Sequence, residues 1–352
     1  MEPLPIPTHF DPGKVGKVWK VPYQKRAAEA ESWAREHNVK PAAGDSGLGI
    51  CLVLIDVQNT FCTPGFELYV GGKTGAGPMD DNRRICEFIY RNLNRITRIC
   101  PTMDTHQPMQ IFHSIFLVND EGKHPPPLTS ISTEDVENGR WKINPLLASS
   151  VGLAEEDTKK YLEYYVRSLK QGRKFDYTVW PYHAILGGIG HALVSSVEEA
   201  IFFHSIARYS SANIQIKGKH PLTEHYSVFG PEVQKDHQDH QDRQLVARNT
   251  ALIDSILGYD AVVIAGQAKS HCVAWTVSDL LDEIRNRDPN LAGKIYLMED
   301  CTSPVVVPGK VDFIADADAA FQRFQEAGMN IVRSTTAFSD WPGIQDLAAV
   351  KG

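Results

Sequence analysis

The sequence predicts an α/β protein, a Rossmann-like three-layer sandwich with a mostly parallel six-stranded sheet and helices on both faces. Two observations predict this fold class. Short apolar runs alternate with longer segments of helical periodicity along most of the 352 residues. Parallel strands also need crossover connections, and the helical segments lie where these connections would run. In such a sheet, functional residues gather at the carboxyl ends of the strands.

The predicted elements follow the chain in this alternating order. The strand candidates are the apolar runs 51–57, 110–118, 212–218, 261–266, 294–300 and 329–334. Apolar residues at spacings of three and four predict helices between them. These helices cover residues 82–96, 197–209, 243–257, 272–286 and 315–328.

Three parts of the chain do not fit this repeating unit. Residues 1–46 form an N-terminal arm with Pro-rich turns and one short amphipathic helix, which we expect to lie on the core or on a neighbouring subunit. The main domain covers 47–342, interrupted at about 119–178 by a polar insertion that is positioned to cover the site. Residues 343–352 form a C-terminal tail.

Composition excludes several classes of function. The formal net charge is -7 and no long Lys/Arg run occurs, so we expect no nucleic-acid partner and no binding to anionic membranes. No apolar run reaches the roughly 18 residues of a membrane span, and the first residues lack the pattern of a signal peptide. We therefore expect a cytoplasmic protein, and a homo-oligomer formed through the N-terminal arm. The 6 cysteines lack metal-type pairs and are expected to be reduced thiols.

Chemically capable side chains follow the predicted strands. Asp56 ends the first strand, Lys217 ends the third, Cys272 follows the fourth, and Asp104 and His106 lie in the DTH motif. Each alone has an ordinary interpretation, because a strand-end Asp often caps a helix, a Lys is often solvated and a buried Cys is often a small hydrophobe. Together they place an acid, a cation and a nucleophile around one crevice.

The predicted chemistry is that of a cysteine nucleophile. Cys272 lies at the start of a helix, where the helix dipole and the Lys217 ammonium favour the thiolate. Asp56 can accept the thiol proton and return it to a leaving amine. Backbone N–H groups at the same helix start can hold an oxyanion. Lys219 is an alternative for the cation, although the spacing from the KG pair to YSVF favours Lys217.

Five motifs then carry a resemblance. DVQNTFC, DTH, WPYHAILGGIG, KGKHPLTEHYSVF and GQAKSHCVAWTVSDL occur in this order. The series resembles the isochorismatase-like cysteine hydrolase superfamily and, within it, the nicotinamidases. It covers roughly residues 48–118 and 179–338 and leaves the arm and the insertion unexplained.

The resemblance implies roles for particular residues. Asp56, Lys217 and Cys272 match the catalytic triad of the family. The backbone N–H groups of Ala268 and Cys272 match its oxyanion hole, with a cis peptide expected at Gln267-Ala268. The chain departs from the family at Gln267, where an aliphatic residue is usual.

The resemblance also implies a divalent metal, zinc, iron or manganese, held by Asp104, His106 and His183. One carboxylate with two imidazoles suits these ions. The alternative is a local turn at Asp104 and His106 with an ordinary core histidine at His183. His113 is a weaker candidate inside a buried strand pattern.

Two further histidines, His237 and His240, lie in the polar run KDHQDHQDRQ, which predicts a solvated loop or the start of a helix rather than a metal site.

Two aromatic residues match the positions that enclose the pyridine ring in nicotinamidases, namely Phe61 and Trp180. A flat heteroaromatic amide suits such a slot, although both rings could instead be ordinary core. Ala184 and Gly188 stand where Cys and Thr are common in the family, which leaves room for a changed substrate.

The predicted function is therefore a metal-dependent cysteine amidohydrolase, which converts nicotinamide to nicotinate and ammonia through a thioester. The alternatives are a related amidase that acts on a carbamoyl, ureido or other small amide, and a catalytically silent binding relative. The expected partner is a small-molecule amide substrate.

Overall fold

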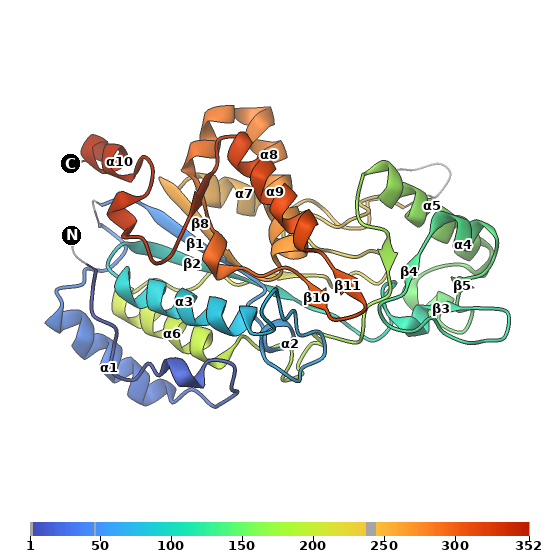
Figure 1. Cartoon of the computed structure of the whole chain (residues 1–352), viewed down its shortest axis with the longest axis horizontal. Coiled ribbons are helices and arrows are strands. Elements are labelled where there is room, and N and C mark those ends of the chain that lie inside the picture. Colours follow the sequence, from blue (N-terminus) through green and yellow to red (C-terminus); the bar gives the residue numbers. More distant parts are fainter. Residues whose placement is uncertain (1–2, 46, 237–243, 352) are drawn as a thin grey trace.

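The structure is a computed structural model of the whole chain, and it describes residues 3–45, 47–236 and 244–351. A six-stranded parallel sheet runs through its centre, in the order β12-β9-β8-β1-β2-β7 (Figure 1). The strands are β1 (Ile50–Ile55), β2 (Ile96–Asp104), β7 (Gln215–Lys217), β8 (Ala261–Gly266), β9 (Ile295–Met298) and β12 (Asn330–Val332). The predicted fold class is confirmed.

The prediction of a sheet strand over 110–118 is wrong. The second sheet strand is β2, where Arg98 and Pro101 interrupt the apolar run that would reveal a strand in the sequence. Residues 110–118 are mostly buried, but they wind through a 3-10 turn before the short strand β3 (Leu117–Val118). That strand pairs with β5 (Lys142–Ile143) outside the main sheet. Burial by the insertion therefore explains the apolar run there.

Helices cover both faces of the sheet (Figure 1). On one face lie α3 (Gly77–Arg91) and α6 (Ser195–Arg208), with α1 (Tyr23–Glu36) packed outside α6; on the other lie α7 (Thr250–Leu257), α8 (Ala274–Arg287) and α9 (Ile314–Glu326). Alternate residues of β1 join two separate cores. Leu52 and Leu54 pack in the core of α3 and α6, whereas Val53 and Ile55 pack in the core of α7, α8 and α9.

The predicted insertion forms a lobe at one end of the molecule (Figure 1). Besides β5 it contains β4 (Ser130–Ile131), α4 (Thr133–Glu137), α5 (Thr158–Gln171) and β6 (Tyr177–Thr178), and β3 leads into it. Tyr161 on α5 donates a hydrogen bond to the carbonyl of Leu222 at 2.5 Å, and Tyr165 accepts one from the N–H of Glu224 at 3.3 Å. The lobe is thus attached to the segment that follows β7.

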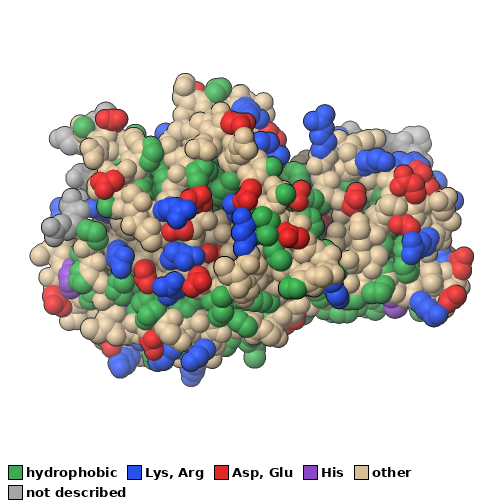
Figure 2. Space-filling model, in the orientation of Figure 1, with side chains coloured by type: hydrophobic (Ala, Val, Ile, Leu, Met, Phe, Trp, Pro, Cys, Tyr) green, Lys and Arg blue, Asp and Glu red, His purple; other side chains and the backbone are tan. Residues whose placement is uncertain are grey.

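Three shorter elements complete the description. They are α2 (Asn59–Cys62), the hairpin of β10 (Val306–Val307) and β11 (Val311–Asp312), and α10 (Ile344–Lys351). Among the described residues, none of the helices combines the length and the apolar character needed to cross a membrane. On the face shown in Figure 2, acidic and basic side chains are interspersed.

The N-terminal arm lies on its own chain. Trp19 and Ser195 exchange two hydrogen bonds, from the Trp19 N–H at 3.0 Å and from the Ser195 hydroxyl at 3.1 Å. The Arg26 guanidinium on α1 forms an ion pair with Glu199 on α6 at 2.8 Å, and both side chains are buried. These contacts favour the first of the two predicted placements of the arm, and the predicted homo-oligomer stays a prediction.

Arg26→Met is expected to lower the free energy of unfolding by about 3 kcal/mol, because it leaves the Glu199 carboxylate buried without its cation. Urea denaturation measures this change. The neighbouring Lys25, whose side chain is 73% exposed, provides the control, since Lys25→Met should change stability by less than about 0.5 kcal/mol. Equal stability of the two variants would show that the ion pair does not anchor the arm.

Candidate active site

The order of the strands defines where a site can form. From β1 the chain builds the sheet in one direction, through β2 to β7, and from β8 in the other direction, through β9 to β12. The boundary between β1 and β8 is a topological switch point, which is the usual location of ligand sites in open parallel sheets. Asp56 follows β1 directly, and Cys272 lies in the turn between β8 and α8.

Four side chains meet at the carboxyl ends of the central strands. They are Asp56 after β1, Asp104 at the end of β2, Lys217 at the end of β7 and Cys272 in the turn after β8. The Lys217 Nζ lies 3.0 Å from Asp56 Oδ2, 3.0 Å from Asp104 Oδ1 and 3.6 Å from Cys272 Sγ. Lys217 is paired with Asp104 in the register of β7 and β2, so the sheet itself places this ammonium beside that carboxylate. Lys217 also donates to the carbonyl of His225 at 2.9 Å. All four side chains are buried.

Local backbone geometry directs the Asp56 carboxylate into this cluster. Asp56 has a φ of 45°, a left-handed conformation that Asp tolerates better than most residues. Thr102 on β2 fixes the turn from both sides. Its hydroxyl accepts from the Asp56 N–H at 3.1 Å and donates to Asp56 Oδ1 at 2.5 Å. The second carboxylate oxygen is thereby left facing the Lys217 ammonium.

Burial opposes the thiolate that was expected at Cys272, whereas the Lys217 ammonium favours it as expected. Burial raises the pKa of Cys272 well above its usual value; the Lys217 charge lowers it, but Asp56 and Asp104 raise it again. Burial also raises the pKa of Asp56, and Lys217 opposes this effect. For Lys217, burial alone would lower the pKa, yet Asp104 and Asp56 raise it well above its usual range. Burial thus works against ionisation of both the thiol and the carboxylate, and the Lys217 ammonium favours ionisation of both.

Cys272 lies in a π-helical turn, Lys269–Val273, that leads into α8. The backbone of Ala268 precedes this turn, and both Ala268 and Cys272 line the pocket described below. The structure contains the expected cis peptide at Gln267-Ala268. The helix start thus brings the two predicted oxyanion-hole residues to the same wall as the sulfur.

The three predicted metal ligands lie together. One potential ligand atom from each of Asp104, His106 and His183 falls within 4.8 Å of the others, and all three residues are buried. His106 Nε2 is 2.7 Å and His183 Nε2 is 3.7 Å from Asp104 Oδ2. The Nδ1 atoms of the two rings face carbonyl oxygens, of Gly218 at 3.1 Å and of Pro181 at 2.8 Å. Each ring thus donates from Nδ1 and keeps Nε2 available as a ligand.

Two neighbours that the sequence interpretation did not include support this ligand set. Gly218 has a φ of 83°, and a Cβ there would lie 2.6 Å from Asp104 Oδ1, so only glycine lets this backbone approach the carboxylate. The Gln58 side chain bonds both backbone groups of Asp104, donating to its carbonyl at 2.8 Å and accepting from its N–H at 2.7 Å. The donor atoms therefore suit a divalent cation, and the neighbouring residues hold these donors in place.

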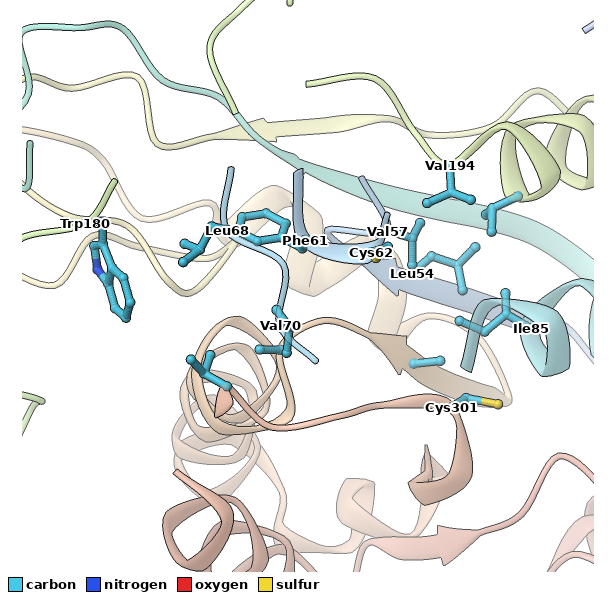
Figure 3. Close-up of a cluster of buried hydrophobic side chains, with 14 of the residues drawn as sticks. Leu54, Val57, Phe61, Cys62, Leu68, Val70, Ile85, Trp180, Val194 and Cys301 are labelled. Carbon is cyan, nitrogen blue, oxygen red and sulfur yellow. The ribbon is translucent and has the colours of Figure 1, made fainter. Parts of the chain in front are cut away.

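A pocket of about 390 Å³, part of it open to solvent, lies above the cluster. Its lining combines apolar walls with a polar floor. The lining residues are Phe61, Leu68, Val70, Asp104, Trp180, His183, Glu224, Tyr226, Ala268, His271, Cys272 and Val305. Figure 3 shows Phe61, Leu68 and Val70 on the segment that follows β1, with Trp180 apart from them. Both predicted aromatic residues are therefore at the pocket.

Three polar residues of this pocket were missed in the sequence interpretation. Tyr226 accepts a hydrogen bond from Trp180 Nε1 at 2.9 Å, and its ring lies 5.2 Å from that of His271. Burial lowers the pKa of His271 to about 3, so this ring is neutral. Burial raises the pKa of Glu224 to about 7, against the lowering effect of His106. Glu224 and Tyr226 lie within an irregular segment, where no periodicity could have indicated that they face the pocket.

The remaining candidates lie elsewhere. Lys219 is exposed, outside the cluster of Lys217. The His113 ring is buried with its centroid 6.0 Å from those of His106 and His183, and it is not part of the three-residue ligand group. His237 and His240 lie outside the described residues.

Among known proteins, the chain is similar to several solved structures of nicotinamidases and pyrazinamidases. No protein-family model matches the chain, and no curated protein matches it. Among solved structures, a nicotinamidase/pyrazinamidase of Acinetobacter baumannii is 21% identical with a TM-score of 0.47, and the match covers 82% of this chain and 97% of that one. The yeast nicotinamidase is 18% identical with a TM-score of 0.48, covering 80% and 99%.

A third match is a pyrazinamidase of Pyrococcus horikoshii in complex with zinc, 17% identical with a TM-score of 0.42, covering 81% of this chain and 98% of that one. These proteins belong to the group that the sequence motifs resemble. At such identities and TM-scores, the likeness carries no argument about the activity of this chain.

Proposed function

We propose that the protein is a metal-dependent cysteine amidohydrolase that converts nicotinamide to nicotinate and ammonia. The observation that carries this proposal is the convergence of Cys272, Lys217 and Asp56. Cys272 lines the pocket, and Lys217 Nζ lies 3.6 Å from its sulfur and 3.0 Å from the Asp56 carboxylate. A nucleophile with a base and a cation beside it is an arrangement suited to acyl transfer.

The first half of the reaction forms a thioester. Asp56 takes the thiol proton as the Cys272 sulfur attacks the amide carbon, and a C–S bond forms while the carbonyl oxygen becomes an oxyanion. The N–H groups of Ala268 and Cys272 are proposed to hold this oxyanion. The tetrahedral species then collapses, the C–N bond breaks, and Asp56 returns its proton to the departing nitrogen. Ammonia leaves, and Lys217 stabilises the negative charges that form next to it.

The second half hydrolyses the thioester with one water molecule. The water oxygen attacks the acyl carbon while Asp56 accepts a proton from this water. The same two N–H groups bind the oxyanion that forms. Collapse breaks the C–S bond, and the proton on Asp56 returns to the sulfur. The products are a carboxylic acid and the original thiol, so the cycle is complete without an external oxidant or reductant.

Asp104, His106 and His183 would hold the divalent cation, with zinc, iron and manganese as candidates. When bound, the cation would supply a Lewis-acidic contact for the ring nitrogen of the substrate. Phe61 and Trp180 would enclose the flat ring, and the Trp180–Tyr226 hydrogen bond would fix the orientation of the indole.

An ammonia-release assay with nicotinamide tests the proposed activity directly. A panel that contains pyrazinamide, benzamide, an aliphatic amide and a carbamoyl compound tests specificity in the same format. Turnover of the aromatic heterocyclic amides above the others is the expected result. Turnover of carbamoyl compounds alone would favour the related amidase, and no turnover of any amide by metal-loaded protein would contradict the proposal.

His183→Ala is expected to remove most of the bound metal and to raise KM for nicotinamide by about tenfold or more, because the ligand set loses one of three residues. Elemental analysis measures the metal, and steady-state kinetics measures KM. The rate of alkylation of Cys272 by iodoacetamide should change far less than KM, since no hydrogen bond joins His183 to the sulfur.

His113→Ala is the matched control, because it removes a buried imidazole that packs beside His106 and His183 but is not one of the three proposed ligands. It should retain its metal. Loss of metal in both variants would show that the ligand set is wrong as assigned, and a metal-free preparation with unchanged KM would refute the role of the cation in substrate binding.

A further inference from the structure

Gln267 is a polar side chain in the wall behind the sulfur, at a position where the resembled family has an aliphatic residue. It is fully buried and both ends of its amide are bonded. Gln267 Nε2 donates to Asp81 Oδ2 at 2.8 Å, and Gln267 Oε1 accepts from the backbone N–H of Ser303 at 3.2 Å. A leucine would fill a similar volume but would leave the Asp81 carboxylate and the Ser303 N–H without these two bonds.

The partner of this amide is itself held rigidly. Asp81 is a buried residue of α3, and its Oδ2 accepts a second hydrogen bond from the Ser303 hydroxyl at 2.6 Å. Its Oδ1 accepts a hydrogen bond from Arg84 Nη2 at 2.9 Å. A buried polar network with every member bonded fixes the positions of all its members. Gln267 is therefore tied to a helix on the opposite face of the sheet from α8.

The same network brackets the segment that leads to the nucleophile. The Gln267 N–H donates to the carbonyl of Ile55 at 2.7 Å, one residue before Asp56. On the far side of Ala268, the Lys269 N–H donates to the carbonyl of Ser303 at 2.8 Å. Ala268 thus lies between two anchored residues, and Ser303 bonds both the Lys269 backbone and the Gln267 side chain. The peptide that carries the Ala268 N–H has little freedom to rotate.

We propose that Gln267 and Asp81 are positioning residues, which hold the Ala268 N–H in the orientation that binds the oxyanion of the reaction. This inference rests on the proposed function and deepens it. Oxyanion donors act by being aimed in advance at the place where charge develops. A residue that only aims such a donor should affect the transition state much more than the bound substrate.

Gln267→Leu and Asp81→Asn are expected to lower kcat for nicotinamide by about 10- to 100-fold, since a misplaced oxyanion donor loses much of its effect. KM should change by no more than about twofold, because neither side chain reaches the pocket. Arg26→Met is the control for a general loss of stability. It should lower the melting temperature through the arm and leave kcat at the wild-type value.

A variant in which the amide of Gln267 and the carboxylate of Asp81 are exchanged distinguishes a positioning role from simple packing. Gln267→Glu places a carboxylate against Asp81 and should lower kcat strongly. Adding Asp81→Asn recreates a carboxylate–amide pair with the roles reversed, in which Arg84 still finds an acceptor. The double variant should recover kcat at least about tenfold over Gln267→Glu, since the recovered geometry restores most of one oxyanion donor.

The outcomes are distinct from those that test the proposed function. If wild-type protein releases no ammonia from any amide, the proposed function fails first. If wild type is active but Gln267→Leu keeps its kcat, or KM rises as much as kcat falls, the positioning role is overturned. If Gln267→Glu does not fold, Gln267→Leu and Asp81→Asn still decide the question, and no recovery in a folded double variant also counts against the inference.

Discussion

Cys272→Ala is expected to lower kcat for nicotinamide hydrolysis by at least about 10,000-fold, because the reaction loses the atom that forms the covalent intermediate. The fold should remain intact, since alanine fills most of the space of a small side chain at a helix start. Ammonia release measures the loss, and circular dichroism with the melting temperature checks the fold.

Cys51→Ala is the matched control for this experiment. Cys51 is also a buried free thiol, and burial raises its pKa beyond the usual range. It is the second residue of β1, however, and lies at the opposite end of that strand from Asp56. Its replacement should cost stability and leave kcat near the wild-type value. Retention of even a tenth of the wild-type rate by Cys272→Ala would rule out the covalent mechanism.

Asp56→Asn and Lys217→Met are expected to fail in different ways, although both residues contact the same cluster. Asp56→Asn should lower kcat by about 1,000-fold, because the departing ammonia loses its acid. The thiol should nevertheless alkylate as fast or faster, since Asp56 raises the pKa of Cys272 and its charge is removed. Lys217→Met removes the group that lowers the pKa of Cys272, so alkylation at neutral pH should slow by about tenfold.

The measurement is the pH profile of iodoacetamide alkylation beside turnover, for wild type, both single variants and the double variant. The profile should shift to higher pH in Lys217→Met and to lower pH in Asp56→Asn. The double variant should lose much less activity than the product of the two single losses, because the residues act as one unit. An unchanged alkylation profile in Lys217→Met would remove Lys217 from the proposed triad.

The fold was predictable where strands are buried on both faces. Runs such as 261–266 are apolar throughout, because a central parallel strand has helices on each side, and β8 has the predicted bounds. The second strand was missed for the opposite reason. Arg98 is exposed near the start of β2 and Pro101 lacks an N–H, so the local pattern there does not resemble a central strand.

Residues at strand ends were predictable because parallel topology brings all carboxyl ends to one edge. Asp56, Lys217 and Cys272 could be grouped in this way before any distance was known. The charge state of the sulfur could not, because it depends on the balance between burial and the charges of Lys217, Asp56 and Asp104. Glu224 could not be placed either, since its segment follows no regular period.

The pairing of Gln267 with Asp81 could not be predicted from the sequence either. In the sequence, Gln267 is only a departure from the aliphatic residue that is usual in the resembled family. Its partner Asp81 is far away in the chain, on α3, and the two meet only because β8 and α3 pack in the folded structure. Pairings of this kind depend on tertiary geometry, which no local pattern encodes.

The most direct test of the covalent mechanism is mass spectrometry of metal-loaded protein quenched in acid during turnover of nicotinamide. We expect a fraction of the protein to gain the mass of one acyl group. Peptide mapping should place this group on Cys272, and Cys272→Ala should carry no acyl group. Turnover without any acylated protein under conditions where thioester hydrolysis is slowed, or an acyl group on another residue, would contradict the covalent mechanism.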